Sequence, residues 1–214
     1  MERIKIDSEN YSLVKEKIKS ALQRGEVVVL PTDTVYGLVA DALNEKAVAK
    51  VFKIKRRPRN KPLPVFVESV SQAERFCYLN SQQRNFLEKV WPGQVTAVLP
   101  SRENSPLPED FFQKEKKIAL RTPGSRLVLD VLKELRTPLT GTSANLSGQS
   151  GDSDPEAIIR QFETLSLRPF FLIDRGILPN KASTIVDIAR ENVRILRKGI
   201  LSESQIQSIW KECL

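Results

Sequence analysis

The sequence contains no histidine, and only two cysteines and one methionine occur among its 214 residues. Without histidine, the chain cannot form a Ser-His-Asp or Cys-His catalytic site, use a histidine general base or bind a metal through imidazole. Cys77 and Cys213 lie far apart, and neither belongs to a CxxC pair. A zinc site or a disulfide framework is therefore not expected, no metal ligand is assigned, and the cysteine usage agrees with a reducing cytoplasm.

Two further absences narrow the class of protein. No apolar run reaches the length of a membrane span, and residues 1–12 lack the apolar core of a signal peptide. We therefore expect a cytoplasmic protein that has no membrane partner. The chain also lacks GxxxxGK[ST] and GxGxxG, which argues against a P-loop enzyme and a Rossmann dehydrogenase.

Positive charge is in excess. Lysine and arginine number 34 against 26 acidic residues, which gives a formal net charge of +8 and an isoelectric point near 9.6. Such a balance favours polyanionic partners, either nucleotide phosphates or RNA, although a basic surface that only maintains solubility is the alternative. The length suits one domain with a sizeable core, so residues 1–214 are interpreted as a single domain.

The stretch 26–42, EVVVLPTDTVYGLVADA, organises the interpretation. Residues 27–30 are apolar and β-branched, which predicts a short strand buried on both faces. Thr32, Asp33 and Thr34 follow directly, where the chain must turn. Polar groups at strand ends build ligand sites in open α/β sheets, but a β-turn that only satisfies backbone groups explains them equally well.

A cluster of basic residues follows the next predicted helix, over 53–62 (KIKRRPRNKP). A solvated loop is the usual state of such a run, but the apolar helix before it and the strand 63–67 after it fix both ends, which favours an anion site. Because no glycine-rich phosphate loop exists, side chains must hold any phosphates.

Other polar residues end predicted strands. Arg121 closes a strand beside Pro123, and it can bind a carboxylate through two parallel hydrogen bonds or simply form a salt bridge. Ser143 and Asn145 follow the strand 137–142, where they suit phosphate or ribose contacts or else form a turn network. We expect these groups to meet in one basic, concave site.

Strands and helices alternate along the chain. Helices are predicted over 8–25, 45–52, 81–91, 125–135, 155–162 and from 202 onward, with a short helix opened by a capping box at Ser71 and Glu74. Strands are predicted over 27–30, 63–67, 95–99, 118–121, 137–142, 170–173, 183–187 and 193–197, and 101–117 as a surface loop. The predicted class is α/β: a twisted mixed β-sheet flanked by helices around a basic concave cavity.

Six short motifs follow one another in a familiar order. They are PTDTVYGL at 31–38, Lys-x-Arg at 55–57, PGxxT at 92–96, RxP at 121–123, Ser-x-Asn at 143–145 and STIVD at 183–187. In this order, which covers about 25–199, the chain resembles the YrdC-like family of L-threonylcarbamoyladenylate synthases. The resemblance implies the YrdC/RibB-like fold and a nucleotidyltransferase that joins L-threonine, bicarbonate and ATP into threonylcarbamoyl-AMP and pyrophosphate.

The same resemblance implies roles for single residues. Lys55 and Arg57 are the implied catalytic cations, and the implied ATP-binding residues are Lys55, Arg57, Lys61, Lys117, Ser143, Asn145 and Arg197. Threonine binding falls to Thr34, Arg121 and Ser183. Two positions depart from the family: Phe66 stands where a histidine is frequent, and Lys117 occupies a region where a hydroxyl residue is common.

No step of the implied reaction needs a protein nucleophile, and Mg²⁺ would arrive with the ATP phosphates. The implied partners are tRNA or double-stranded RNA and a downstream tRNA threonylcarbamoyl transferase that completes N6-threonylcarbamoyladenosine. Two alternatives stay open. One is a non-catalytic tRNA-binding or double-stranded-RNA-binding maturation factor of the same fold, and the other is a carbamoyl-transfer domain like those of hydrogenase maturation proteins.

Overall fold

The computed structural model describes residues 1–113, 115–149 and 153–214. The helices in this part are α1 (Tyr11–Gln23), α2 (Glu45–Lys55), α3 (Val70–Ala73), α4 (Ser81–Val90), α5 (Arg126–Leu135), α6 (Pro155–Glu163) and α7 (Glu203–Lys211). The strands are β1 (Glu2–Lys5), β2 (Val28–Leu30), β3 (Gly37–Val39), β4 (Val65–Phe66), β5 (Val95–Pro100), β6 (Phe112–Gln113), β7 (Lys117–Arg121), β8 (Leu139–Thr140), β9 (Thr142–Ser143), β10 (Phe171–Asp174), β11 (Thr184–Asp187) and β12 (Arg194–Arg197).

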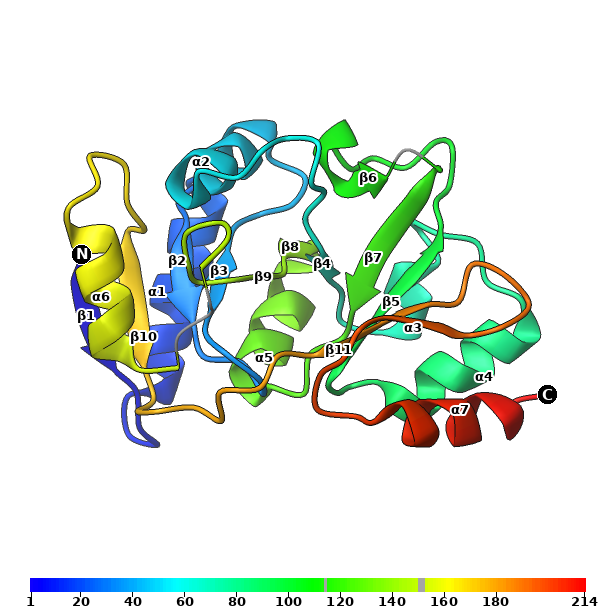
Figure 1. Cartoon of the computed structure of the whole chain (residues 1–214). Helices are drawn as coiled ribbons and strands as arrows, with labels where there is room; N and C mark the ends of the chain where they lie inside the picture. The colour runs from blue at the N-terminus through cyan, green and yellow to red at the C-terminus, as the bar shows by residue number, and fades with distance from the viewer. Residues whose placement is uncertain (114, 150–152) are drawn as a thin grey trace.

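The strands form two sheets, which lie beside each other in Figure 1. One has the order β1-β10-β2-β3-β9, and the other has the order β12-β11-β5-β7-β4-β8 with β6 paired to β7. Each sheet contains both parallel and antiparallel pairs. The predicted α/β class with mixed strand pairing is confirmed, although the sheet is divided in two.

The division occurs at Gly141. The single strand predicted over 137–142 is in fact β8, which pairs with β4, and β9, which pairs with β3 in the other sheet. A Cβ atom at Gly141 would lie 2.7 Å from the Phe66 ring. The backbone can therefore pass this ring only because residue 141 has no side chain.

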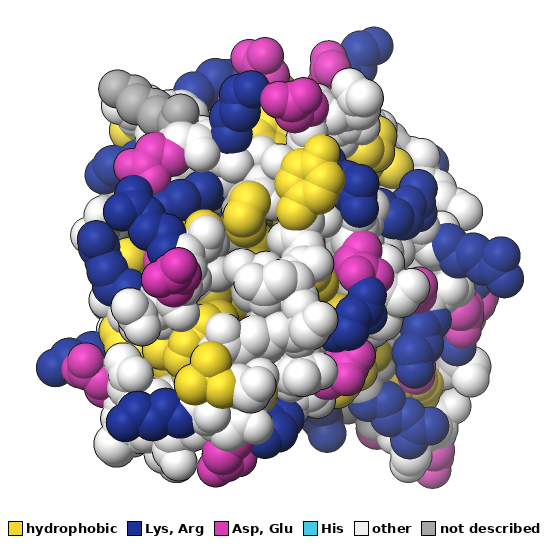
Figure 2. All heavy atoms as spheres, turned by 90° about the vertical axis from the view of Figure 1, so that its right-hand side faces the viewer, with side chains coloured by type: hydrophobic (Ala, Val, Ile, Leu, Met, Phe, Trp, Pro, Cys, Tyr) yellow, Lys and Arg dark blue, Asp and Glu magenta, His cyan; other side chains and the backbone are white. Residues whose placement is uncertain are grey.

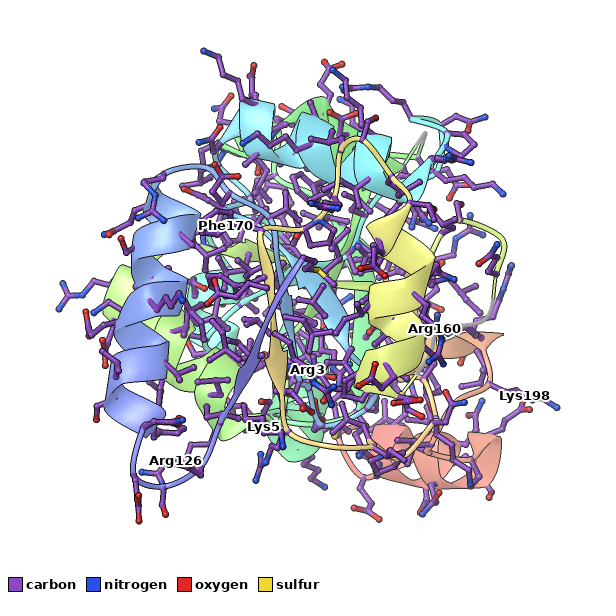
Figure 3. All side chains as sticks on the ribbon, turned by 90° about the vertical axis from the view of Figure 1, so that its left-hand side faces the viewer. Arg3, Lys5, Arg126, Arg160, Phe170 and Lys198 are labelled. Carbon is purple, nitrogen blue, oxygen red and sulfur yellow. The ribbon has the colours of Figure 1, made fainter. Side chains whose placement is uncertain are left out.

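Apolar faces of α1 and α5 pack on the first sheet. Val14 and Ile18 of α1 and Val128 and Val131 of α5 are buried in one cluster with strands β2 and β10. Figure 3 shows α1 and α6 on opposite sides of the β1 and β10 edge. Burial of this kind supplies most of the helix stability, since isolated helices of such length are marginal in water.

Several local predictions are confirmed and others are wrong. Asn44, which directly precedes the predicted helix 45–52, caps α2, and Ser202 with Gln205 forms a capping box at the start of α7. The capping residue of α3 is Ser69, two positions before the predicted Ser71, because the Ser69 hydroxyl accepts the backbone N–H of Gln72.

No strand was predicted before residue 27, yet the N-terminal segment contains β1. This strand pairs in parallel with β10 along its whole length. Arg3, labelled in Figure 3, donates to Asp174 of β10 at 2.8 Å and also pairs with Glu156 of α6. The spacing of Leu13, Val14 and Ile18 predicts that all three lie on the buried face of α1, but Leu13 is 74% exposed. Among the helices of the described ranges, none has the length and apolar character that crossing a bilayer requires.

Candidate functional site

A cavity of about 600 Å³ is lined by residues of both sheets. Its walls combine strand ends from the two halves of the fold: the turn after β2, β3 and β9 on one side, and β4, β5, β7, β11 and β12 on the other. Among its lining residues are Thr32, Thr34, Tyr36, Arg57, Phe66, Thr96, Arg121, Ser143, Asn145, Ser183 and Arg197. Its volume falls within the range of small-molecule sites.

Seven of the predicted site residues are therefore brought together. They are Thr34, Arg57, Arg121, Ser143, Asn145, Ser183 and Arg197. Their positions in the chain run from 34 to 197, yet six of them follow or end a strand or helix and Ser183 directly precedes β11, as expected for groups at strand ends. Three others, Lys55, Lys61 and Lys117, do not line this cavity.

Arg121 is the most constrained cation of the site. Its side chain is 4% exposed, and it donates from Nε to the Gly93 carbonyl at 2.8 Å, from Nη1 to Thr34 Oγ1 at 3.1 Å and from Nη2 to Asp33 Oδ1 at 2.6 Å. Burial lowers the pKa of Arg121, and Asp33 opposes this change. Sequence reasoning assigned no role to Asp33, whose carboxylate neutralises this buried charge.

Arg197 and Ser183 form a second polar group. Arg197 Nη2 donates to the Ser183 carbonyl at 2.9 Å and to its hydroxyl at 3.1 Å. The Ser183 hydroxyl also lies 2.9 Å from Thr96 Oγ1. Thr96 matched a family motif but had no assigned role. Here Thr96 and Arg197 hold Ser183 at the start of β11.

Lys55 lies behind the cavity wall at the end of α2. Its ammonium donates to the carbonyl oxygens of Ser143 and Asn145, the latter at 2.8 Å, and to Asn145 Oδ1 at 3.2 Å. The residue is 1% exposed. Burial, and secondarily the charge of Arg57, lowers the pKa of Lys55 to about 7. Lys55 thus fixes the turn that presents Ser143 and Asn145.

Arg57 stands at the cavity and braces the basic loop. Its Nε donates to the carbonyl of Lys61 at 2.7 Å, and its Nη2 donates to the carbonyl of Pro62 at 2.9 Å. Burial lowers the pKa of Arg57. Lys61 contributes a backbone oxygen to this loop, and its own side chain is exposed.

Lys117 differs most from expectation. Its ammonium lies 2.7 Å from Glu115 and 3.0 Å from Asp187, and the hydrogen bond to Glu115, followed by that to Asp187, raises the pKa of Lys117. The residue lines a neighbouring cavity of about 870 Å³. Two carboxylates already neutralise this cation, so it does not add free charge to the wall described above.

Phe66 occupies the wall where a histidine is frequent in the resembling family. Its ring centroid lies 5.8 Å from the Arg121 guanidinium. An aromatic ring beside a desolvated guanidinium supplies apolar contact and a weak cation–π attraction. Within the described ranges, no cluster of three or more acidic or cysteine side chains could hold a metal ion.

The comparisons with known proteins cover most of the chain. The family Sua5_yciO_yrdC, described as telomere recombination, matches residues 20–199. A protein of Methanocaldococcus jannaschii, provisionally named a threonylcarbamoyl-AMP synthase, is 33% identical over 92% of this chain and 90% of its own length. The threonylcarbamoyl-AMP synthase of Bacillus subtilis is 31% identical over 88% of this chain, which spans only 54% of that protein.

Solved structures have the same fold. The crystal structure of Pyrococcus abyssi Sua5 complexed with L-threonine superposes with a TM-score of 0.86 at 26% identity, over 97% of this chain and 60% of that one. Escherichia coli YciO superposes with a TM-score of 0.83 at 23% identity, over 96% of this chain and 98% of that one.

Proposed function

The chain belongs to the Sua5/YciO/YrdC family, and from this membership we propose that it is a threonylcarbamoyl-AMP synthase. The proposed reaction converts L-threonine, bicarbonate and ATP into threonylcarbamoyl-AMP, pyrophosphate and water. The product supplies the threonylcarbamoyl group of N6-threonylcarbamoyladenosine in tRNA. Relatives that bear this name differ in length, since the chain spans 90% of one and 54% of another.

One observation carries the proposal: a single cavity combines side chains that can bind an amino acid with side chains that can bind phosphates. The amino acid end has Arg121, which retains N–H groups for a carboxylate, together with Thr34 and Ser183. We assign the phosphate end to Arg57 and Arg197, and this end adjoins the amino acid end, because Arg197 donates to Ser183. Planar guanidinium groups match carboxylate and phosphate oxygens in paired hydrogen bonds.

The chemistry proceeds between substrates that the walls orient. Bicarbonate takes up a proton and loses water to give CO₂, and the amine of threonine adds to this CO₂ and releases a proton to form a carbamate. A carbamate oxygen then attacks the α-phosphorus of ATP while pyrophosphate leaves. The cations neutralise the charge that develops on the phosphate oxygens. The Ser143 hydroxyl donates to Asn145 Oδ1 and the Asn145 amide donates to the carbonyls of Leu146 and Gln149, so these two side chains would have to leave these acceptors to donate to a phosphate. Holding both substrates in one cavity removes most of the entropic barrier to their encounter.

We propose separate roles for the basic residues. Arg57 and Arg197 contact the phosphates directly. Lys55 acts through the turn of Ser143 and Asn145 and reaches a phosphate only by leaving their carbonyl oxygens. Lys117 would have to leave Glu115 and Asp187 to contact ATP, and Lys61 would have to fold its exposed side chain inward.

Magnesium enters this proposal with the nucleotide. The donor set of the phosphate end consists of hydroxyl, amide and guanidinium groups, and Asp33 is already paired with Arg121. Such a set fits an ion that is held by phosphate oxygens and water, as Mg²⁺ commonly is. Bound in this way, the ion would neutralise phosphate charge.

The proposal extends to partners and compartment. tRNA is the final acceptor of the threonylcarbamoyl group, and a tRNA threonylcarbamoyl transferase consumes the product. The cytoplasm is the proposed compartment, where ATP, bicarbonate and free threonine are all supplied. The face in Figure 2 presents no continuous basic surface to RNA, because basic and acidic side chains are interspersed on it.

Product analysis tests the proposed activity. Incubation with ATP, bicarbonate and L-threonine should yield a nucleotide with the mass of threonylcarbamoyl-AMP, and omission of threonine should abolish it. Arg121→Ala should raise the threonine KM by roughly tenfold to a hundredfold, because a charge-assisted contact is lost. Arg126→Ala, at an exposed position on α5, is the matched control and should behave as wild type. Failure to form this nucleotide at saturating substrates would refute the function.

A further inference from the structure

The hydroxyl groups of Thr32 and Thr34 are joined in a network that fixes where their hydrogens lie. Thr32 Oγ1 is 2.6 Å from the carbonyl oxygen of Val35, and since that oxygen has no hydrogen, Thr32 must be the donor. The backbone N–H of Thr34 donates to Thr32 Oγ1 at 3.1 Å. The two Oγ1 atoms are 3.0 Å apart. Because the one hydroxyl hydrogen of Thr32 is already used, Thr34 donates in this contact.

The hydroxyl of Thr34 then has one hydrogen-bonding position left. Its hydrogen points to Thr32, and Nη1 of Arg121 donates to its oxygen at 3.1 Å. A hydroxyl oxygen accepts two hydrogen bonds, so one lone pair remains. Thr34 lines the cavity and is 2% exposed. What it offers to a ligand is therefore an acceptor.

Arg121 beside it offers the opposite polarity. Its guanidinium has five N–H hydrogens, and the three contacts to Gly93, Thr34 and Asp33 leave others available. The wall thus presents donors at Arg121 and an acceptor at Thr34. An α-amino acid is the complement of this pair, since its carboxylate only accepts and its amine donates.

We propose that Thr32 is a positioning residue that sets the polarity of Thr34 and thereby makes the site select an amine N–H of the substrate. This inference rests on the proposed function. The selection persists during the reaction, because R–NH₂ + CO₂ gives R–NH–COO⁻ + H⁺ and the nitrogen keeps one hydrogen for Thr34. Without Thr32, the Thr34 hydroxyl is free to rotate and can donate as well as accept.

A matched pair of ligands tests this polarity. L-2-Aminobutanoate and 2-oxobutanoate share a skeleton and a carboxylate, but the first carries an N–H donor at the α-carbon and the second a carbonyl acceptor. Calorimetric binding to wild type should favour the amine by roughly tenfold to a hundredfold. Thr32→Val should lower this preference about tenfold, mainly by tighter binding of 2-oxobutanoate, and Thr32→Ser should retain it.

The outcomes distinguish the role of Thr32 from the proposed function. An unchanged preference in Thr32→Val overturns the role of Thr32, whereas absence of L-threonine binding to wild type refutes the proposed function instead. If Thr32→Val does not fold, Thr34→Val takes its place, because it removes the acceptor and must also lower the preference. An ATP affinity that falls as much as the preference does would mean a merely structural role.

Discussion

The enclosed ammonium of Lys55 makes the stability of the fold depend on pH in a defined direction. In the folded chain burial lowers the pKa of Lys55 to about 7 from its ordinary 10.5, whereas the unfolded chain keeps the ordinary value. Between these two values the unfolded state binds more protons than the folded state. The free energy of unfolding therefore rises with pH through this window.

The size of the effect follows from the two pKa values. Between about pH 6.5 and about pH 9.5, the difference in bound protons integrates to about 3 kcal/mol. Lys55→Met removes the titrating group but also leaves the carbonyl oxygen of Asn145 without its donor, at a pH-independent cost of about 1–3 kcal/mol, whereas the carbonyl oxygen of Ser143 keeps the backbone N–H of Asn145. The free energy of unfolding of the variant should therefore lie closer to that of wild type at the lower pH.

Urea unfolding at the two pH values measures how the difference in unfolding free energy between wild type and variant changes with pH. The stability gap between wild type and Lys55→Met should widen by about 3 kcal/mol on going to the higher pH. Lys53→Met, at an exposed position of the same helix, is the control and should follow wild type. Parallel pH profiles for wild type and Lys55→Met would refute the reasoning, because they would mean that the ammonium is not destabilised by its enclosure.

Two further substitutions probe the walls. Asp33→Asn removes the anion that holds Arg121 and should raise the threonine KM roughly tenfold while the ATP KM stays within about twofold; steady-state kinetics that show equal changes in both would contradict this. Gly141→Ala places a Cβ 2.7 Å from the Phe66 ring and should lower both the free energy of unfolding, by about 1–3 kcal/mol, and the threonine affinity. Denaturation and calorimetry that match wild type would show that the ring moves aside without cost.

Local signals predicted the helices and the positions of the motifs. Asn44 lies just before a run of apolar residues at helical spacing, and its side chain caps α2 by accepting the backbone N–H of Ala47, three residues later. The strand after Gly25 was evident because its residues are apolar and mostly β-branched, and the structure buries them as predicted. The expectation that polar strand ends meet in one cavity depended only on the alternation of elements, and the cavity contains most of the predicted residues.

Features that depend on distant partners were not predicted. Residues 139–143 look like one strand locally, and only their pairing with β4 on one side and β3 on the other divides them. Lys117 resembles a free cation in sequence, but its partner Asp187 is 70 positions away. The pair of Arg121 and Asp33 spans 88 positions. No periodicity or spacing rule predicts a specific contact at such separations.

The long sequence separations between contacting residues also determine when the cavity forms during protein synthesis. Arg121 meets Thr34 across 87 positions and Lys55 meets Asn145 across 90, and contacts that close such long loops form late in folding. The last wall strand, β12, ends at Arg197, so an emerging chain has no complete cavity until residue 197 has left the ribosome. A ligand that needs every wall therefore stabilises the finished fold and none of its fragments. Substrates should therefore bind only to completely folded chains. Protection from proteases by ATP and threonine would measure this selective binding directly.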